Sequence, residues 1–245
     1  MDILYWTSLA AIISAGGFMR GFSGFGTTLV MVPLLSLLML PSQAVFLALS
    51  IDVIVIIPIL PKAIKQAEWK PIVPLVVGSL AAIPLGAWIL VMASPGTMRI
   101  VISVMVLTSA LLLLNGWSYR GEKTKLLSFV VGIFSGIANG ATAIGGPPIA
   151  VYFIAKGMPP VVFRASLNVV AFIMQGLSVI AIYSMGSFEM SNTVRIFTLA
   201  PLMFIFVWFG SIIFKLVDNR LFNRLMLYFL ISFAAYILII TIYNT

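Results

Sequence analysis

Two glycine-rich stretches hold most of the side chains in this chain that could bind a small charged ligand. They span residues 17–27 and 132–142, and both interrupt apolar sequence. Glycine inside a helix costs about 1 kcal/mol relative to alanine, so such clusters need a reason. Paired breaks of this kind indicate a substrate site in membrane transporters; close helix packing through small residues is the alternative. The polar side chains at the two stretches are Arg20, Ser23, Thr27, Asn139 and Thr142.

The chemistry of these stretches suits an anion. A broken helix presents unpaired backbone N–H groups, and the positive end of its dipole, where its second half begins. We expect Gly26-Thr27 and residues 140–142 to supply these groups. Arg20 or Arg164 adds a planar guanidinium that matches two oxyanion oxygens. The predicted substrate-binding set is Arg20, Ser23, Gly24, Gly26, Thr27, Asn139, Gly140, Thr142, Gly145, Gly146, Arg164 and Asn168.

Both arginines also have a structural interpretation. An arginine inside the membrane costs about 2.5 to 3.5 kcal/mol on insertion scales and usually marks function. Arg20 could instead extend its side chain to the cytoplasmic surface, and Arg164 could be an anchor at that surface, one turn into its helix. The sequence leaves these alternatives open.

Further polar residues lie inside apolar runs. Arg164, Asn168 and Gln175 are spaced by 4 and 7 residues, so they share one helix face, which should look inward. Asp52 is the one acidic residue deep inside an apolar run. Because an isolated charge in lipid is costly, this carboxyl group is protonated, paired with an arginine, or used for proton coupling. Asp52 and Gln175 are therefore candidates for coupling, with structural pairing as the alternative.

Composition places the chain in a membrane. Of 245 residues, 62% are hydrophobic and 8% are charged, against about 25% charged in soluble domains. The net charge of +8 is carried between apolar runs, as the positive-inside rule expects, which excludes nucleic acid as a partner. Cysteine and histidine are absent from the sequence, which removes disulfides, thiol chemistry and the commonest metal ligands. We predict no catalytic residues, no metal and no cofactor.

Neither an enzyme nor an ATP-driven pump fits the sequence. It offers no convergent catalytic pair and lacks the nucleotide-binding pattern Gly-x-x-x-x-Gly-Lys. Energy for transport would come from ion gradients, or transport would be passive. The N-terminus has no basic region and no small-residue cleavage site, so we expect no removable signal peptide.

Eight apolar runs define the expected membrane elements. A crossing helix needs about 20 residues, and the first and fifth runs are much longer, with a glycine-rich break near the centre of each. Both should fold back on themselves inside the bundle, where protein or a water-filled cavity satisfies the broken backbone. The runs are residues 3–40, 44–60, 72–93, 100–114, 126–155, 161–183, 196–214 and 225–242.

The chain contains an internal repeat. A shift of 115 positions pairs Gly17 with Gly132 and Gly21 with Gly136. The polar linker at residues 119–125 separates the halves, which gives repeats at residues 1–120 and 121–245. The predicted fold is an all-α polytopic membrane protein with two inverted repeats, each a glycine-broken helical hairpin followed by three transmembrane helices.

Loop charges give the expected orientation. With both long runs folded back, 11 of the 14 basic residues fall on one side, which the positive-inside rule assigns to the cytoplasm. The opposite side includes both termini and the loop with Glu189. The 11 residues are Lys62, Lys65, Lys70, Arg120, Lys123, Lys125, Lys156, Arg164, Lys215, Arg220 and Arg224.

The motifs resemble those of the TauE/SafE family of sulfite and organosulfur anion exporters over essentially the whole chain. The resemblance is carried by Gly21-Phe22-Ser23-Gly24-Phe25-Gly26, by Ile144-Gly145-Gly146-Pro147-Pro148 and by Arg164-Ala165-Ser166. It implies transport of a small sulfur-containing anion, such as sulfite, sulfoacetate or thiosulfate, across a bacterial-type plasma membrane. The first stretch departs from the second because it has Arg20 in place of Ser135 and lacks Gly-Gly-Pro-Pro, so an equal contribution of the two to a site is not expected.

The expected partners are a small anion and the lipid bilayer, and a homo-oligomer is left open. Two other functions also remain open. One is a non-transporting membrane subunit or scaffold of a larger complex, and the other is transport of a different small organic anion. The leading hypothesis is a secondary transporter that exports a sulfur-containing anion.

Overall fold

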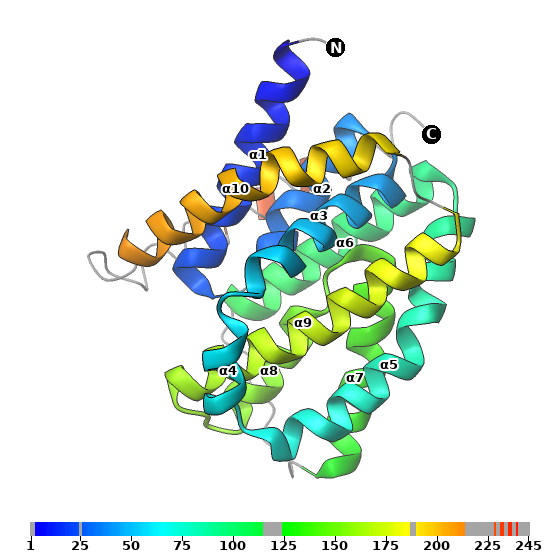
Figure 1. Cartoon of the computed structure of the whole chain (residues 1–245). Coiled ribbons are helices and arrows are strands. Elements are labelled where there is room, and N and C mark those ends of the chain that lie inside the picture. The colour runs from blue at the N-terminus through cyan, green and yellow to red at the C-terminus, as the bar shows by residue number, and fades with distance from the viewer. Residues whose placement is uncertain are drawn as a thin grey trace.

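The computed structural model describes residues 3–24, 26–114, 124–186 and 190–213, together with residues 228, 231–232, 235–236 and 239. Ten helices and no strand occur in these ranges (Figure 1). The helices are α1 Ile3–Ser23, α2 Thr27–Leu38, α3 Pro41–Ile56, α4 Leu60–Gln66, α5 Trp69–Met92, α6 Pro95–Leu114, α7 Lys125–Thr142, α8 Gly146–Ala155, α9 Pro160–Ser184 and α10 Met190–Ile213.

The all-α class and the several membrane crossings are confirmed. Five helices are long and apolar enough to cross a bilayer: α5, α6, α7, α9 and residues 192–213 of α10. A sixth crossing is available if α3 and α4, which meet at a bend of 74°, form one span. Some predicted features lie outside the described residues, namely the boundary between the halves, most of the run 225–242, Phe25, Arg120, Lys123, Glu189, Lys215, Arg220 and Arg224.

Both long apolar runs are divided at their glycine-rich stretches, as predicted. Between α1 and α2, Gly24 and Gly26 have φ values of 82° and 87°, which side chains with a Cβ rarely adopt. Between α7 and α8, Ala143 has a φ of 60°. The halves that follow the breaks, α2 and α8, have 12 and 10 residues and are too short to cross a membrane alone.

The backbone donors of the second break differ from the expected ones. Residues 140–142 form the last turn of α7, and the next helix begins at Gly146, after Gly145. The expectation that residues 140–142 supply the free N–H groups was therefore wrong. At the start of α8 the backbone N–H groups belong to Gly145 and Gly146, since the two prolines that follow have none.

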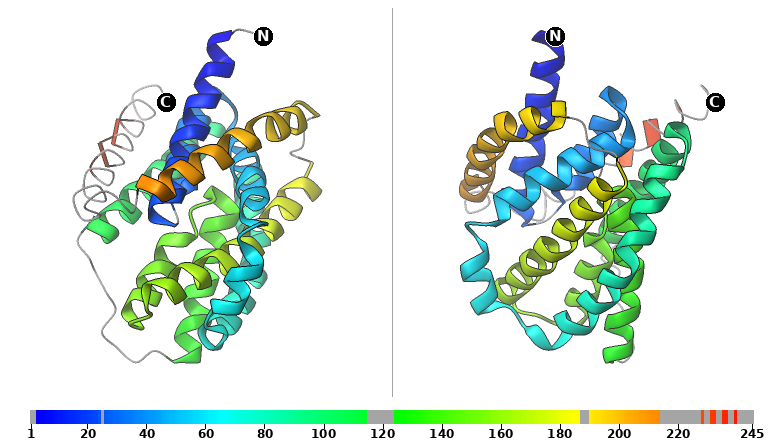
Figure 2. Two further views of the ribbon diagram at one scale, coloured as in Figure 1. Left: turned by 60° about the vertical axis from the view of Figure 1, so that its left-hand side comes forward. Right: turned by 45° about the vertical axis from the view of Figure 1, so that its right-hand side comes forward.

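Glycines join the helices into two close pairs, α5 with α7 and α1 with α10 (Figure 2). A methyl group at Gly140 would overlap the carbonyl oxygen of Ile83 on α5. One at Gly21 would overlap the carbonyl oxygen of Val207 on α10. Close packing, the alternative interpretation of the glycine clusters, thus explains the glycines within α1 and α7. At the breaks, Gly145 is also closely packed, against the carbonyl oxygen of Ser135, whereas Gly24 and Gly26 are set apart by their positive φ values.

The helix boundaries of the first half recur later in the chain. α1 ends at Ser23 and α7 ends 119 residues later, and both α2 and α3 begin 119 residues before α8 and α9. This spacing is four residues longer than the shift of 115 found in the sequence. Because the glycines of α7 recur every four residues, about one helical turn, the sequence alone aligns them equally well in either register. In the structural spacing, Arg20 corresponds to Asn139 and Gly24 to Ala143.

Helix α3 lies at the centre of the molecule, between α9 and α10 (Figure 1). Residues 44–52 are all buried, on every side of the helix. A helix that is apolar all round is one that other helices surround. The single charged residue of this stretch, Asp52, is 0% exposed. Its position brings a carboxylate into the middle of the bundle.

Candidate anion-binding site

A cavity of about 50 Å³ lies between the two helix breaks. Its walls come from the end of α1, the start of α2, the break between α7 and α8, and the facing sides of α3 and α9. Nine of the fourteen residues predicted for binding or coupling line it. They are Arg20, Gly24, Gly26, Thr27, Asp52, Asn139, Gly145, Gly146 and Gln175.

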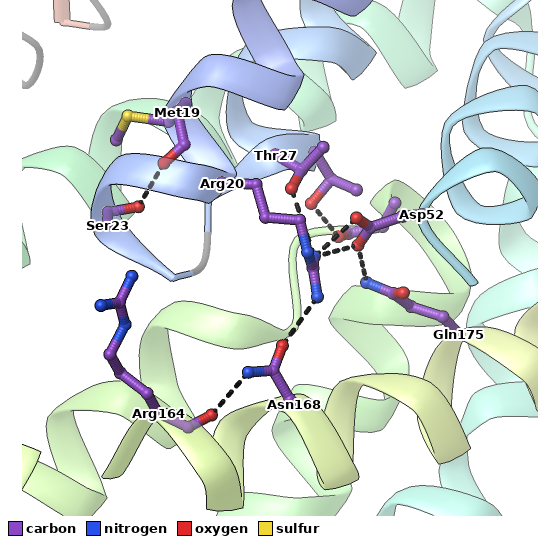
Figure 3. Close-up of polar contacts among 10 residues, drawn as sticks. Met19, Arg20, Ser23, Thr27, Asp52, Arg164, Asn168 and Gln175 are labelled. Carbon is purple, nitrogen blue, oxygen red and sulfur yellow. Dashed lines mark hydrogen bonds and ion pairs between the residues drawn. The ribbon is translucent and has the colours of Figure 1, made fainter. Parts of the chain in front are cut away.

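An ion pair between Arg20 and Asp52 forms one wall of the cavity (Figure 3). Arg20 Nη1 donates to Asp52 Oδ1 at 2.5 Å and to Oδ2 at 2.7 Å, and it also reaches Thr27 Oγ1 at 3.3 Å. Arg20 is 5% exposed, so its guanidinium group does not extend to the surface in this structure. The pairing that the sequence left open for Asp52 is therefore with Arg20.

Helix α9 completes this network through two amide side chains. Arg20 Nη2 donates to Asn168 Oδ1 at 2.9 Å, and Gln175 Nε2 donates to Asp52 Oδ2 at 2.7 Å. These two residues are seven positions apart, so they lie on the same inward face, as their spacing predicted. Arg164 stands apart, with its guanidinium directed toward the end of α1 (Figure 3).

Two buried polar atoms in the cavity wall have no hydrogen-bond partner among the described residues. They are Nε of Arg20 and Oε1 of Gln175. Leaving such an atom unpaired costs about 1–3 kcal/mol, so each marks a place where water or a ligand would be stabilised. The first-turn N–H groups of α2 and α8 border the same cavity, because Thr27, Thr28 and Gly146 line it.

The two breaks are held to each other and to α9. Thr28 Oγ1 donates to the carbonyl oxygen of Ala143 at 2.7 Å, which ties the start of α2 to the second break. Asn139 Nδ2 donates to Ser178 Oγ on α9 at 2.8 Å. The positions of the cavity walls thus depend on hydrogen bonds between segments more than 35 residues apart in sequence.

Five predicted residues in the described part of the chain do not line this cavity: Arg164 and Asn168, which line an adjoining one, and Ser23, Gly140 and Thr142. The hydroxyl groups of Ser23 and Thr142 donate back to carbonyl oxygens of their own helices, those of Met19 and Ala138, each at 2.8 Å. Gly140 faces Ile83 and Ala87 on α5. Its role in the structure is helix packing.

A second, larger cavity of about 340 Å³ adjoins the first; we call it the vestibule. Arg20 and Gly24 line both spaces. Lys62, Arg164 and Asn168 line the vestibule alone, so it carries three cationic side chains counting Arg20. Arg164 Nη2 donates to the carbonyl oxygens of Gly21 and Phe22 at 3.2 and 3.4 Å, where the helix dipole of α1 is negative.

Seven of the residues that line the cavity were not predicted from the sequence, and two of them, Thr28 and Ala143, lie beside the helix breaks. Thr28 lines the cavity from the first turn of α2, and the helix-terminus argument used for Thr27 applies equally to its neighbour. Ala143 lines the cavity at the left-handed position of the second break. Nothing about an alanine in sequence signals that conformation, because glycine is the residue that normally adopts it.

A bundle of membrane-crossing helices whose two broken helices meet at a buried polar cavity defines a multi-pass membrane protein of the transporter class. The comparisons make this specific. The sulfite exporter TauE/SafE family matches residues 9–237, so the chain belongs to that family, whose members are transporters and not enzymes.

One curated protein is similar to this chain. The probable sulfite/organosulfonate exporter TauE of Cupriavidus necator is 25% identical over 175 residues. The alignment covers 66% of this chain and 66% of the relative, so about a third of each protein lies outside it. No solved structure matches the chain.

Proposed function

We propose that the protein is a secondary transporter that exports a small sulfur-containing oxyanion, with sulfite or a small organosulfonate as the substrate class, across a bacterial-type plasma membrane. The cavity between the helix breaks carries this proposal. It combines the arginine Arg20 with the N-termini of two half-helices, α2 and α8. Each of these features favours negative charge. The energy for transport comes from ion gradients, including that of the anion itself.

The size of the cavity favours a small substrate. A cavity needs about 10–15 Å³ of space open to the centre of a water-sized sphere to hold one water molecule. This cavity offers about 50 Å³. That space suits an anion of a few heavy atoms and excludes a long organic chain unless the helices move apart. Sulfite and methanesulfonate fit this limit better than a branched or aromatic sulfonate.

The vestibule provides the route to the cavity from the side that bears Lys62. Three cations along it would attract an anion, and Arg20, which lines both spaces, would receive it. The recurring helix boundaries support an inverted repeat with halves 1–120 and 121–245. In that arrangement, the pairs α1 with α10 and α5 with α7 are equivalent, and rocking of one pair against the other would open the site to each side in turn.

This topology predicts that the two ends of α9 face opposite sides of the membrane. Gln66 lies near the start of α9, where Glu68 N–H donates to Ser166 Oγ, and Met185 follows the end of α9. Because the native chain has no cysteine, single Gln66→Cys and Met185→Cys variants report access directly. We expect an impermeant maleimide to label position 185 from outside and position 66 from the cytoplasm. Labelling of both from one side would exclude the proposed topology.

Binding can be tested with a panel of anions on the purified protein. A ligand that binds the folded state alone adds RT ln(1 + [L]/Kd) to stability. We expect sulfite, thiosulfate, sulfoacetate or methanesulfonate to raise the unfolding temperature, and chloride at equal ionic strength to have no effect. A scaffold would show no selective shift. Stabilisation by acetate or another carboxylate in place of the sulfur anions would support transport of an organic anion.

The same panel should distinguish Asn139→Ala from the unmodified protein. Asn139 is 4% exposed and lines the cavity at the second break. Hydrogen bonds to charged groups are worth about 1.5–3 kcal/mol, so loss of the Asn139 amide should weaken anion binding roughly ten- to a hundredfold. Ser103→Ala is the control, because it removes a buried hydroxyl of α6 that bonds to its own helix at Arg99, away from the cavity. Equal affinity in both variants would remove Asn139 from the site.

A further inference from the structure

Asp52 stands out among the groups that could carry a proton through this protein. The sequence has no histidine and no cysteine, and Glu68, the other acidic residue among the described ranges, lies at the entry to α5. Asp52 is fully buried, lines the cavity, and is bound by Arg20 and Gln175. A carboxylate in this position either serves structure alone or takes part in the transport cycle.

Charge balance in the cavity distinguishes these roles. Among the described lining residues, Arg20 and Asp52 are the charged ones, and their charges cancel. An anion that enters and pairs with Arg20 would add a net negative charge to a water-poor interior, which is costly. A proton on Asp52 removes that charge. The same proton weakens the hold of Asp52 on Arg20 and leaves the guanidinium group available to the anion.

The polar groups around the pair suit such an exchange of partners. Arg20 Nε is buried and without a partner among the described residues, and Gln175 Oε1 is likewise unpaired. When Asp52 carries a proton, Gln175 could turn its amide so that Oε1 accepts it, since the two side chains already lie within hydrogen-bond distance at 2.7 Å. Arg20 Nε could then donate to the anion.

Resting on the proposed transport function, we propose that each anion crosses with a proton bound to Asp52. Two forms of the carrier then switch the site from one side of the membrane to the other. One is the empty carrier with its Arg20–Asp52 ion pair, and the other is the carrier that holds an anion and a proton. Both keep the interior neutral for a singly charged anion. The proton comes from water in the vestibule and is released with the anion on the other side. Export proceeds when the anion gradient exceeds the opposing proton gradient.

The other charged groups on helices near α3 are cations, and the three arginines among them have partners of their own. Arg164 donates to the end of α1, Arg99 donates to Ser36, and Arg195 donates to Asn192 and stacks on Tyr5. Among the described residues, Arg20 alone forms an ion pair with Asp52. The cations concerned are Arg20, Lys62, Lys65, Lys70, Arg99, Arg164 and Arg195.

Proton movement can be measured in proteoliposomes that contain a pH-sensitive dye. Methanesulfonate is the probe because it is a fully ionised strong-acid anion and carries no proton itself. With the membrane potential clamped at zero by potassium and valinomycin, an inward methanesulfonate gradient should acidify the lumen by about one proton per anion, since that keeps the interior neutral. An unchanged lumen pH alongside methanesulfonate uptake would overturn the coupling and leave transport intact.

The variant Asp52→Asn tests whether proton movement depends on Asp52 while anion movement continues. The variant mimics protonated Asp52, so exchange of labelled methanesulfonate across the membrane should persist within a few-fold, while acidification falls at least about tenfold because the carrier has no proton to release. Glu68→Gln, which removes the carboxylate paired with Lys156 at 3.8 Å, is the control and should acidify normally. Normal acidification by Asp52→Asn would overturn the proposal. Absence of exchange even in the unmodified protein would instead refute the proposed transport, and the coupling with it.

A second measurement needs no variant and decides the matter if Asp52→Asn does not fold. Calorimetry of methanesulfonate binding in two buffers with different ionisation enthalpies gives the number of protons taken up on binding. We expect about one proton per anion, because binding requires a proton on Asp52. Binding with no proton uptake would contradict the coupling.

Discussion

Arg20→Gln is expected to destabilise the protein by about 3–5 kcal/mol, because it leaves the fully buried carboxylate of Asp52 without its charged partner. The substitution also removes the guanidinium group that we assign to anion binding. The unfolding temperature in detergent should fall sharply, and no anion should restore it. Chemical unfolding of the purified protein in a mild detergent measures the change directly.

The double variant Arg20→Gln/Asp52→Asn is the matched control. Without either charge, the interior has no unpaired ion, so most of the lost stability should return. Anion binding should not return, because the guanidinium group is still absent. Should the double variant be no more stable than the single one, the ion pair is not the source of the loss. Recovery of anion binding would remove Arg20 from the site.

Gly140→Ala is expected to destabilise the protein by about 1–3 kcal/mol, since its methyl group would overlap the backbone of α5 at Ile83 and force α5 and α7 apart. This opposes the usual effect of the substitution, because alanine favours a helix over glycine by about 1 kcal/mol. The shift of α7 would also displace the neighbouring Asn139, so anion affinity should fall together with stability.

Gly176→Ala is the control for this prediction. Gly176 lies within α9, and a methyl group there would meet no atom within 4 Å among those described. The same chemical change should therefore leave stability equal or raise it by up to about 1 kcal/mol. Opposite signs at the two positions, measured by unfolding in detergent, would establish that backbone contact decides the outcome. A stable Gly140→Ala variant would contradict the close approach of α5 and α7.

The sequence by itself determined the membrane class, the helical content and the position of both breaks. These follow from local properties: apolar runs about as long as a bilayer is thick predict crossings. Glycine clusters inside such runs mark places where a helix ends, and Gly24 and Gly26 adopt backbone angles that glycine tolerates best. The motifs around the breaks also indicated the family to which the chain belongs.

The sequence could not divide the glycines between packing and the site. Gly140 and Gly145 look alike in sequence, yet one contacts α5 and the other lines the cavity. Whether a glycine faces another helix or the cavity depends on where helix α7 ends, because the chain changes direction there. Glycines spaced by one helical turn can be aligned at a shift of 115 or of 119 residues. The sequence analysis used 115, and the helix ends recur at 119.

Tertiary structure alone decided which polar groups meet. The partners Arg20, Asp52, Asn168 and Gln175 come from three helices that are distant in sequence, so no local pattern pairs them. Spacing showed that Asn168 and Gln175 share a face with Arg164, but not that Arg164 would turn away to the end of α1. A buried charge selects its partner by proximity and by the cost of leaving it unpaired, and both depend on how the helices pack.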